Sequence, residues 1–449
     1  MELTNELIAV AVLVVLGLTT VVAVWPTFGF ALVLGISLVK SLLRSLAPAV
    51  MESFTYDMTV VLVTLLGATI HRLRRGGRDW HLPPAFMFSW LVIAALMWLR
   101  LPASHEAEQG LKNCLIFSIF CTSVCVLCPM FVVSLADARR VLRVVLGLGI
   151  VAVVGMLTIG ERTEDWATAR HSFAGAHVFG VANACVHGII VLFGLWLAQR
   201  KLWQLITLMV CAPAFIFTII ASGTRAPILL TPMVMFLMVW LHRRKLNIKA
   251  IVAFTIGGAV VAAAVAAVLN PDLLYRFRAE AVREALETRT YLARITFAGF
   301  LTNPILGHGP GDTLYQIRTL SHPHNQVLEI ANEIGIFGLL AYLIVVGHGL
   351  KAWWYLRRPE YEGTEAKNVG VTVFGLLLYS GLWTLKSGSY AGAYHFYFFI
   401  TLMVVVQGVG RRTMNRQRRK AAVGSPQQAS ALLDKRGPGH ALTGGPGSR

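Results

Sequence analysis

Apolar runs of about 17–25 residues follow one another along most of this chain, with short polar connections between them. Helical runs of this length match the thickness of a bilayer, and they lack the alternating pattern of a membrane barrel. Hydrophobic residues fill 56% of the 449 positions and charged residues only 14%, against about a quarter in soluble domains. A soluble globular protein, a disordered chain and a disulfide scaffold are therefore excluded, and we predict an all-α, polytopic membrane protein.

The hydropathy pattern predicts about twelve full transmembrane helices among thirteen candidate spans. The candidates are 7–24, 28–46, 55–71, 84–101, 111–134, 140–160, 178–198, 202–221, 226–241, 249–269, 330–350, 369–387 and 393–410. The first two meet at Trp25-Pro26-Thr27, so we expect one of them to be re-entrant or interfacial. We divide the chain into N-terminal spans (1–269), one large loop (270–328), C-terminal spans (329–410) and a basic, disordered tail (411–449).

Basic residues are distributed unevenly between two alternating sets of loops. One set (71–79, 136–143, 199–203, 242–249, 351–367 and 411–420) contains 23 Lys and Arg, and the other set contains 10. Positive charge marks cytoplasmic loops, so the large loop 270–328 is predicted to be external. Nucleic-acid binding by the basic tail is the weaker interpretation of the +18 net charge, because no DNA-binding fold accompanies it.

The large loop differs from every other connection in its length of 59 residues. Residues 272–300 can be helical throughout, because they contain no Pro or Gly before Gly299. The arginines of this stretch are Arg276, Arg278, Arg283, Arg289 and Arg294. Arg278 and Arg289 are eleven residues apart and share a helix face. The alternatives are an amphipathic helix on lipid headgroups and a surface that binds an anion.

Two polar segments follow in the same loop. Residues 303–312 (NPILGHGPGD) predict a tight turn whose exposed backbone amides suit anions, although an ordinary Gly/Pro loop is the alternative. Residues 321–326 (SHPHNQ) then directly precede an apolar run. Two histidines at a membrane surface are energetically costly, so we expect them to have a function. We favour a general base or substrate contact there. A zinc site from His308, His322 and His324 is the rival, but the loop offers no cysteine.

A second interruption, Ser222-Gly223-Thr224-Arg225, falls on the same predicted side. Arg225 could extend towards the bilayer surface, but its position in a helix break between small residues favours capture of an anion. Arginines and a histidine at a membrane edge predict a lipid-linked phosphate or diphosphate and proton abstraction from a hydroxyl. Because no Walker loop or Rossmann fingerprint is present, we expect a donor that arrives already activated.

These motifs resemble the O-antigen ligase and polymerase superfamily of bacterial inner membranes. The matching residues are Arg289 fifteen residues before Pro304-Ile305-Leu306-Gly307-His308-Gly309, then His322-Pro323-His324-Asn325, Glu333-Ile334-Gly335-Ile336-Phe337-Gly338-Leu339-Leu340, and Ser222-Gly223-Thr224-Arg225. The resemblance covers about fifty residues closely and the layout of spans loosely.

The resemblance implies a GT-C-like glycosyltransferase of the cytoplasmic membrane with a periplasmic active site. Ligases of this superfamily move a glycan from undecaprenyl diphosphate to lipid A-core, without a metal, nucleotide or other cofactor. By this resemblance Arg225 and Arg289 bind the diphosphate and His324 is the catalytic base. The remaining substrate-binding candidates are His308, His322, Asn325, Arg276, Arg278 and Arg294.

Three alternatives remain open. A glycan polymerase of the same superfamily is less favoured. Such polymerases have two large external loops with Arg-x10-Gly motifs, whereas this chain has one large loop and none of its external arginines has this motif. A protein oligosaccharyltransferase commonly has an additional C-terminal periplasmic domain. A non-catalytic transporter of lipid-linked sugars should place polar residues deep in several spans, where we find few.

Overall fold

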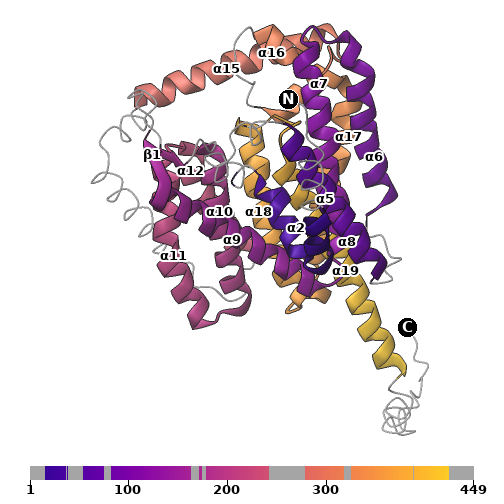
Figure 1. Cartoon of the computed structure of the whole chain (residues 1–449), viewed down its shortest axis with the longest axis vertical. Helices are drawn as coiled ribbons and strands as arrows, with labels where there is room; N and C mark the ends of the chain where they lie inside the picture. Colours follow the sequence, from indigo (N-terminus) through magenta and orange to yellow (C-terminus); the bar gives the residue numbers. More distant parts are fainter. Residues whose placement is uncertain are drawn as a thin grey trace, which may run out of the picture.

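The computed structural model describes residues 16–36, 38, 54–74, 82–162, 171–173, 178–241, 279–317, 325–387 and 389–423. Within these residues the chain forms a bundle of long helices (Figure 1). The first helices are α2 (Pro26–Leu34), α5 (Phe54–Arg74), α6 (Pro84–Arg100), η1 (Leu101–Ala103), α7 (Ala107–Ile116), the π-helical turn η2 (Phe117–Cys121), α8 (Thr122–Phe131) and α9 (Leu135–Ile159). They are followed by α10 (Val178–Gln199), α11 (Leu202–Ala221), α12 (Arg225–Leu241), α15 (Ala279–Thr302), α16 (Asp312–Ile317), α17 (Gln326–Leu356), η4 (Pro359–Tyr361), α18 (Glu365–Ser387) and α19 (Tyr394–Val423). A short antiparallel ribbon joins β1 (Gly160–Arg162) to β2 (His171–Phe173).

In the described part of the chain, seven helical stretches are long and apolar enough to cross a bilayer, or eight if a bent N-terminal pair is one span. The seven are Pro84–Ala103, Ala107–Phe131, Leu135–Thr158, Phe179–Gln199, Leu202–Ala221, Gln326–Leu356 and Glu365–Lys386. Each coincides with a predicted span, and α5, α12 and α19 lie at three more. The predicted span 249–269 lies outside the described residues. The prediction of an all-α polytopic membrane protein is confirmed.

The N-terminal bend is sharp. The helices Leu16–Val24 and Pro26–Leu34 meet at an angle of 116°. Pro26 occupies the first turn of α2, where its missing N–H costs nothing, and it cannot continue the preceding helix. The break therefore falls where the sequence predicts it, at Trp25.

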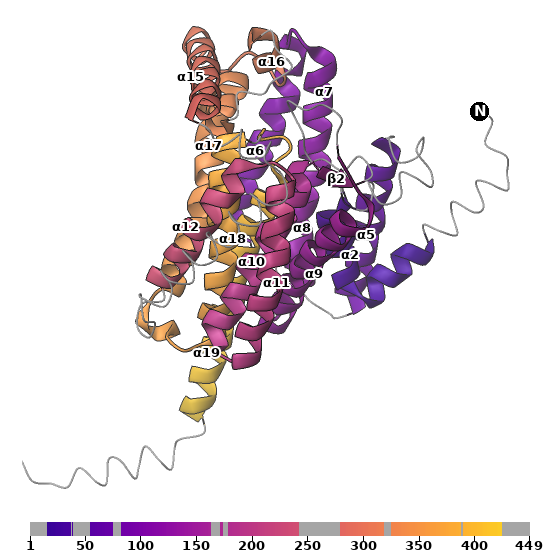
Figure 2. The same cartoon turned by 90° about the vertical axis from the view of Figure 1, so that its left-hand side faces the viewer.

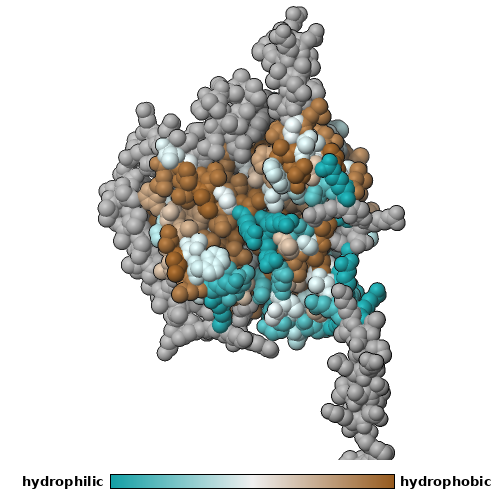
Figure 3. All heavy atoms as spheres, turned by 60° about the horizontal axis from the view of Figure 1, so that its bottom comes forward, coloured by the Kyte–Doolittle hydropathy of each residue, from teal (hydrophilic) through white to brown (hydrophobic). Residues whose placement is uncertain are grey.

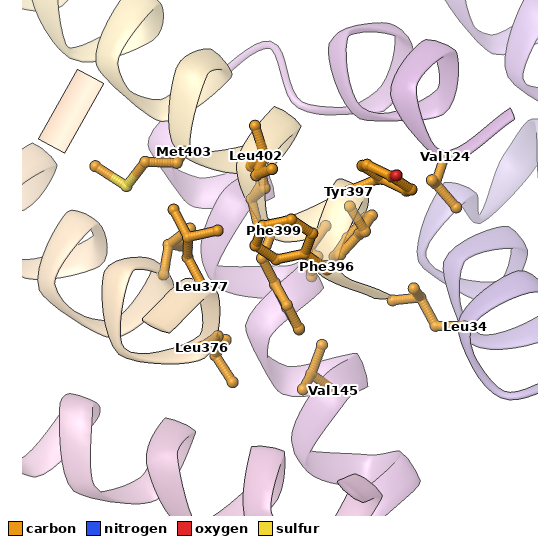
Figure 4. Close-up of a cluster of buried hydrophobic side chains, with 14 of the residues drawn as sticks. Leu34, Val124, Val145, Leu376, Leu377, Phe396, Tyr397, Phe399, Leu402 and Met403 are labelled. Atoms are coloured by element: carbon orange, nitrogen blue, oxygen red, sulfur yellow. The ribbon is translucent and has the colours of Figure 1, made fainter. Parts of the chain in front are cut away.

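The core of the bundle surrounds α18 and α19 (Figure 4). Leu377 of α18, Val145 of α9 and Leu34 of α2 gather around the buried ring of Phe399 of α19. Close packing, and not the hydrophobic effect, drives association between apolar helices in lipid. Small residues permit this packing: a Cβ on Gly194 of α10 would lie 2.2 Å from Oγ1 of Thr372 on α18.

Among the residues that the structure describes, loops of the two predicted sets lie at opposite ends of the bundle (Figure 1). At one end, here the α19 end, Arg139 pairs with Glu365 at 2.9 Å and Arg418 pairs with Glu360 at 3.3 Å. Figure 3 shows hydrophilic residues gathered at this end, with hydrophobic residues beside them. At the other end, the α15 end, helices α15 and α16 lie across the top of the bundle, beside the upper end of α7 (Figures 1 and 2). Which end of the bundle faces the periplasm stays a prediction from the charge pattern.

Helix α19 is longer than predicted. The last span was expected to end at residue 410 and to be followed by a disordered tail, but α19 continues to Val423. The residues after 410 include good helix formers, and no Gly or Pro interrupts them before Gly424. The first part of the basic tail is therefore helical.

Candidate functional site

Arg225 is the first residue of α12, directly after a break between two helices. Helix α11 ends at Ala221, and Gly223 then adopts a φ of 65°, which glycine adopts at little cost. The hydroxyl of Ser222 donates to the carbonyl of Ile219 at 2.6 Å and lies 2.8 Å from the hydroxyl of Thr224. These local bonds fix the turn that presents Arg225 at the α15 end, half-buried among its neighbours.

Arg289 lies near the middle of α15, which runs across the top of the bundle in Figure 1. Its side chain is half-buried. Burial lowers the pKa of the Arg289 guanidinium, and the positive charge of Arg225 lowers this pKa further. The fold thus brings together the two arginines that the sequence assigns to a diphosphate. Like charges repel each other, and an anion bound by both side chains would offset that repulsion.

Of the other predicted arginines, Arg294 does not join this pair. Arg294 is exposed and is five residues after Arg289, so the two side chains point about 140° apart around the helix. It lines an open cavity along α15 with Arg283 and Glu287, which pair with each other at 2.8 Å. Arg276 and Arg278 lie outside the described residues.

The backbone hydrogen bonds of the Gly-rich turn 303–312 favour an ordinary Gly/Pro loop over the alternative of an anion site. The N–H of His308 donates to the carbonyl of Asn332 at 2.9 Å, and the N–H of Gly309 donates to the carbonyl of Glu333 at 2.9 Å. In return, the N–H of Ile336 donates to the carbonyl of Pro304 at 2.8 Å. The backbone amides expected to be exposed are therefore already bonded to α17.

A kink in α17 receives this turn. Gly335 has a φ of 68° and a ψ of −168°, outside the helical region, and a Cβ there would lie 2.2 Å from the carbonyl oxygen of Ile305. Gly307 has a φ of 70°, and its Cβ would lie 2.4 Å from the carbonyl oxygen of Glu333. The two glycines thus let two backbones approach each other, which explains the Gly residues of both motifs.

The His308 side chain contacts the end of α15, just before its own turn. Its Nε2 lies 2.9 Å from the Thr302 hydroxyl and 2.9 Å from the carbonyl oxygen of Gly299. This contact fixes the turn to the end of α15 and favours a structural role over the predicted contact with substrate.

Asn325 is the N-cap of α17. Its side-chain oxygen accepts hydrogen bonds from the N–H groups of Val327 at 3.1 Å and Leu328 at 3.2 Å. An Asn before an apolar run is a typical signal for a helix start, so this role was available from the sequence. His322 and His324 lie outside the described residues. No group of three His, Cys, Asp or Glu side chains in the described ranges could hold a metal.

Two buried glutamates were missed as functional candidates. Glu329 and Glu333 lie one turn apart on α17, and each is 1% exposed. Glu329 accepts from the Ser389 hydroxyl at 2.9 Å and from the N–H of Tyr390 at 3.0 Å. Glu333 accepts from the Tyr390 hydroxyl at 2.9 Å. The signal was present, because two carboxylates in an apolar run are costly unless they are bonded.

The glutamates connect three segments around the start of α17. Glu333 also accepts from the N–H of Thr313 in α16, at 3.4 Å. The carboxylates therefore hold the loop before α19 and the start of α16 against the first turns of α17. The first turns of α17, which follow His322 and His324 in the sequence, are thus held by hydrogen bonds to two other segments.

The comparison with protein families agrees with these motifs. Residues 210–343 match the family model described as O-antigen ligase. The matched region contains Arg225, Arg289, the Gly-rich turn and the first half of α17. A comparison with curated proteins gives no match.

Proposed function

From the match of residues 210–343 to the O-antigen ligase family model, we propose that the chain is a member of the O-antigen ligase and polymerase superfamily. We propose further that it is a glycosyltransferase that completes lipopolysaccharide. It moves O-antigen glycan from undecaprenyl diphosphate to a sugar of lipid A-core. The reaction takes place in the bacterial cytoplasmic membrane, on the periplasmic side, which we assign to the α15 end. It requires neither a metal nor a nucleotide.

The observation that supports this proposal most strongly is the pair of half-buried arginines. Arg225 begins one helix and Arg289 lies on another, 64 positions later, yet the charge of Arg225 acts on Arg289. Guanidinium groups bind phosphate oxygens through two parallel hydrogen bonds. A diphosphate attached to a membrane lipid is an anion that would reach such a pair at the edge of the bilayer.

The proposed chemistry is a single displacement with inversion. His324, which directly precedes the N-cap Asn325, takes the proton of the acceptor hydroxyl. The hydroxyl oxygen forms a bond to the anomeric carbon while the bond from that carbon to the diphosphate oxygen breaks. Undecaprenyl diphosphate leaves, and Arg225 and Arg289 stabilise the negative charge that develops on it.

A reconstituted reaction tests this function. Purified protein is mixed with undecaprenyl-diphosphate glycan and lipid A-core, with a chelator present and no nucleotide, and modified lipid A-core is resolved on a gel. We expect a ladder of product from the wild type and none from His324→Ala. Arg283→Ala is the control, because Arg283 is an exposed arginine of α15 that pairs with Glu287.

Each other outcome changes the conclusion. Longer glycan on undecaprenyl diphosphate, without modified lipid A-core, would make the protein a polymerase. Transfer to a protein acceptor would make it an oligosaccharyltransferase. Neither product from folded protein would leave transport of lipid-linked sugars as the better explanation, and full activity of His324→Ala would exclude that residue as the base.

A further inference from the structure

A stacked pair of aromatic rings is exposed at the α15 end, away from the arginine pair. His105 lies between η1 and α7, and Tyr315 lies on α16. Their ring centroids are 4.8 Å apart and the ring planes differ by 6°. The His105 side chain is 58% exposed and Tyr315 is 48% exposed. We propose that these two rings, here called the aromatic platform, bind a sugar ring of a glycan substrate.

A buried carboxylate holds the platform in place. Asp312 is 1% exposed, and both of its carboxylate oxygens lie 3.1 Å from Nδ1 of His105. The N–H of His105 also donates to Oδ1 of Asp312 at 2.6 Å. The imidazole is therefore fixed through one nitrogen and through its backbone, while the ring stays exposed. Asp312 is the first residue of α16, so the same contacts join His105 to the helix that carries Tyr315.

The segments that carry the two rings are also locked to each other. The Ser104 hydroxyl donates to the carbonyl of Pro310 at 3.0 Å, and the Arg100 guanidinium donates to the carbonyl of Gly307 at 2.8 Å. The platform thus joins two parts of the chain about 200 positions apart, which are fixed before any ligand binds. A preorganised surface loses little conformational entropy on binding.

The chemistry of the platform suits a neutral sugar. A pyranose ring has an apolar face of C–H groups, which packs on an aromatic face, and hydroxyls that bond to polar ring atoms. Tyr315 supplies the aromatic face at low entropy cost, and the imidazole of His105 supplies the polar ring atoms. An anion is less suited, because the buried Asp312 and the exposed Glu106 and Glu108 make the surroundings acidic, with Lys112 as the basic exception.

From its position, we expect the platform to contribute to substrate binding and not to the step in which the glycosidic bond to the diphosphate breaks. Thirteen residues of α15 separate Arg289 from Thr302, a distance of about 20 Å along the helix. The platform lies beyond Thr302, near the start of α16. If the proposed function holds, the platform contacts a sugar at some distance from the diphosphate, in either the donor glycan or the lipid A-core.

Steady-state kinetics of the full-length protein in a membrane mimetic test the platform. Tyr315→Ala should raise KM about tenfold for one of the two substrates, while kcat changes by less than about twofold. Tyr315→Phe is the matched control, since it keeps the ring, and it should retain the wild-type KM. A rise in KM for the donor places the platform under the donor glycan, and a rise for the acceptor places it under the lipid A-core sugars.

Two results would overturn the platform. One is an unchanged KM for both substrates in Tyr315→Ala and His105→Ala. The other is a fall in kcat at constant KM, which would mean that the His105–Asp312 pair takes part in the chemistry.

A binding measurement keeps this inference separate from the proposed function. Saturation-transfer NMR uses the polysaccharide released by mild acid from the producing bacterium's lipopolysaccharide. We expect signals with the wild type and Tyr315→Phe, and weaker signals with Tyr315→Ala. If the wild type binds this polysaccharide but transfers nothing, the platform stands and the ligase function fails. No signal from the wild type would exclude the platform.

Discussion

Two regions of the α15 end differ in how their polar groups interact. In the arginine region, Arg225 and Arg289 are half-buried like charges, and the charge of Arg225 lowers the pKa of Arg289. In the turn region, residues 303–312 are joined to α17 by backbone hydrogen bonds in both directions. The first region has unfavourable repulsion between its side chains, whereas the second has its polar backbone groups satisfied.

This difference indicates a division of roles. Groups with perturbed pKa values cluster at functional sites, and the guanidinium of Arg289 is such a group. A turn whose amides are already bonded offers nothing to an anion, but it can hold the surrounding segments in place. We therefore expect changes in the arginine region to alter activity with little effect on folding, and changes in the turn region to alter stability first.

The largest effect is expected for Gly335→Ala. Alanine at a φ of 68° is strained, and its Cβ would lie 2.2 Å from the carbonyl oxygen of Ile305. We expect a loss of about 3 kcal/mol or more in the free energy of unfolding. Thermal unfolding of purified protein, followed by tryptophan fluorescence, measures it. Gly347→Ala in the same helix is the control, because a Cβ there meets no atom within 4 Å. Equal midpoints for the two variants would contradict the role of the kink.

Arg289→Lys should lower transfer about 100-fold, because lysine keeps the charge but loses the planar fork that binds phosphate. The unfolding temperature should stay at the wild-type value. Gel quantification of initial rates measures the loss, with Arg283→Lys as the control on the exposed side of α15. Near-normal transfer by Arg289→Lys would show that charge alone is needed, and a large drop in stability would remove the contrast between the two regions.

Tyr390→Phe tests the buried glutamates. It removes the hydroxyl that donates to Glu333 at 2.9 Å and leaves a buried carboxylate oxygen without that donor. We expect a loss of about 1–3 kcal/mol in stability, seen as a lower unfolding midpoint. Tyr291→Phe, at an exposed position on α15, should not change the midpoint. If both variants behave alike, Glu333 does not depend on this bond.

The smallest effect concerns Asn325, which the sequence assigns to substrate and the structure shows as a helix cap. Asn325→Ala should cost about 1 kcal/mol in stability, whereas Asn325→Ser keeps a capping oxygen and should cost little. Transfer assays on the two variants separate the roles. Wild-type activity in Asn325→Ser means that capping is its contribution, and a strong loss in that variant would restore a contact with substrate.

Much of the candidate site could be predicted residue by residue. Arg225 was expected in a helix break and Arg289 on a helix of the long loop, and both are found there. The sequence left two interpretations of the Gly-rich turn open, because it does not reveal that the carbonyls of Asn332 and Glu333 accept its amides. Glu329 was missed because its donors, Ser389 and Tyr390, are 60 positions away.

The sequence by itself determined the helices and the membrane class, because the length of an apolar run and the place of a Pro or Gly break act locally. The distribution of basic residues also predicts which loops share an end. Only the tertiary structure decided which polar groups meet: Arg225 with Arg289, the turn with the kink at Gly335, and His105 with Asp312. Hydrogen bonds and charge repulsion act over a few ångströms in space, and residues that are distant in the sequence reach that range only through packing.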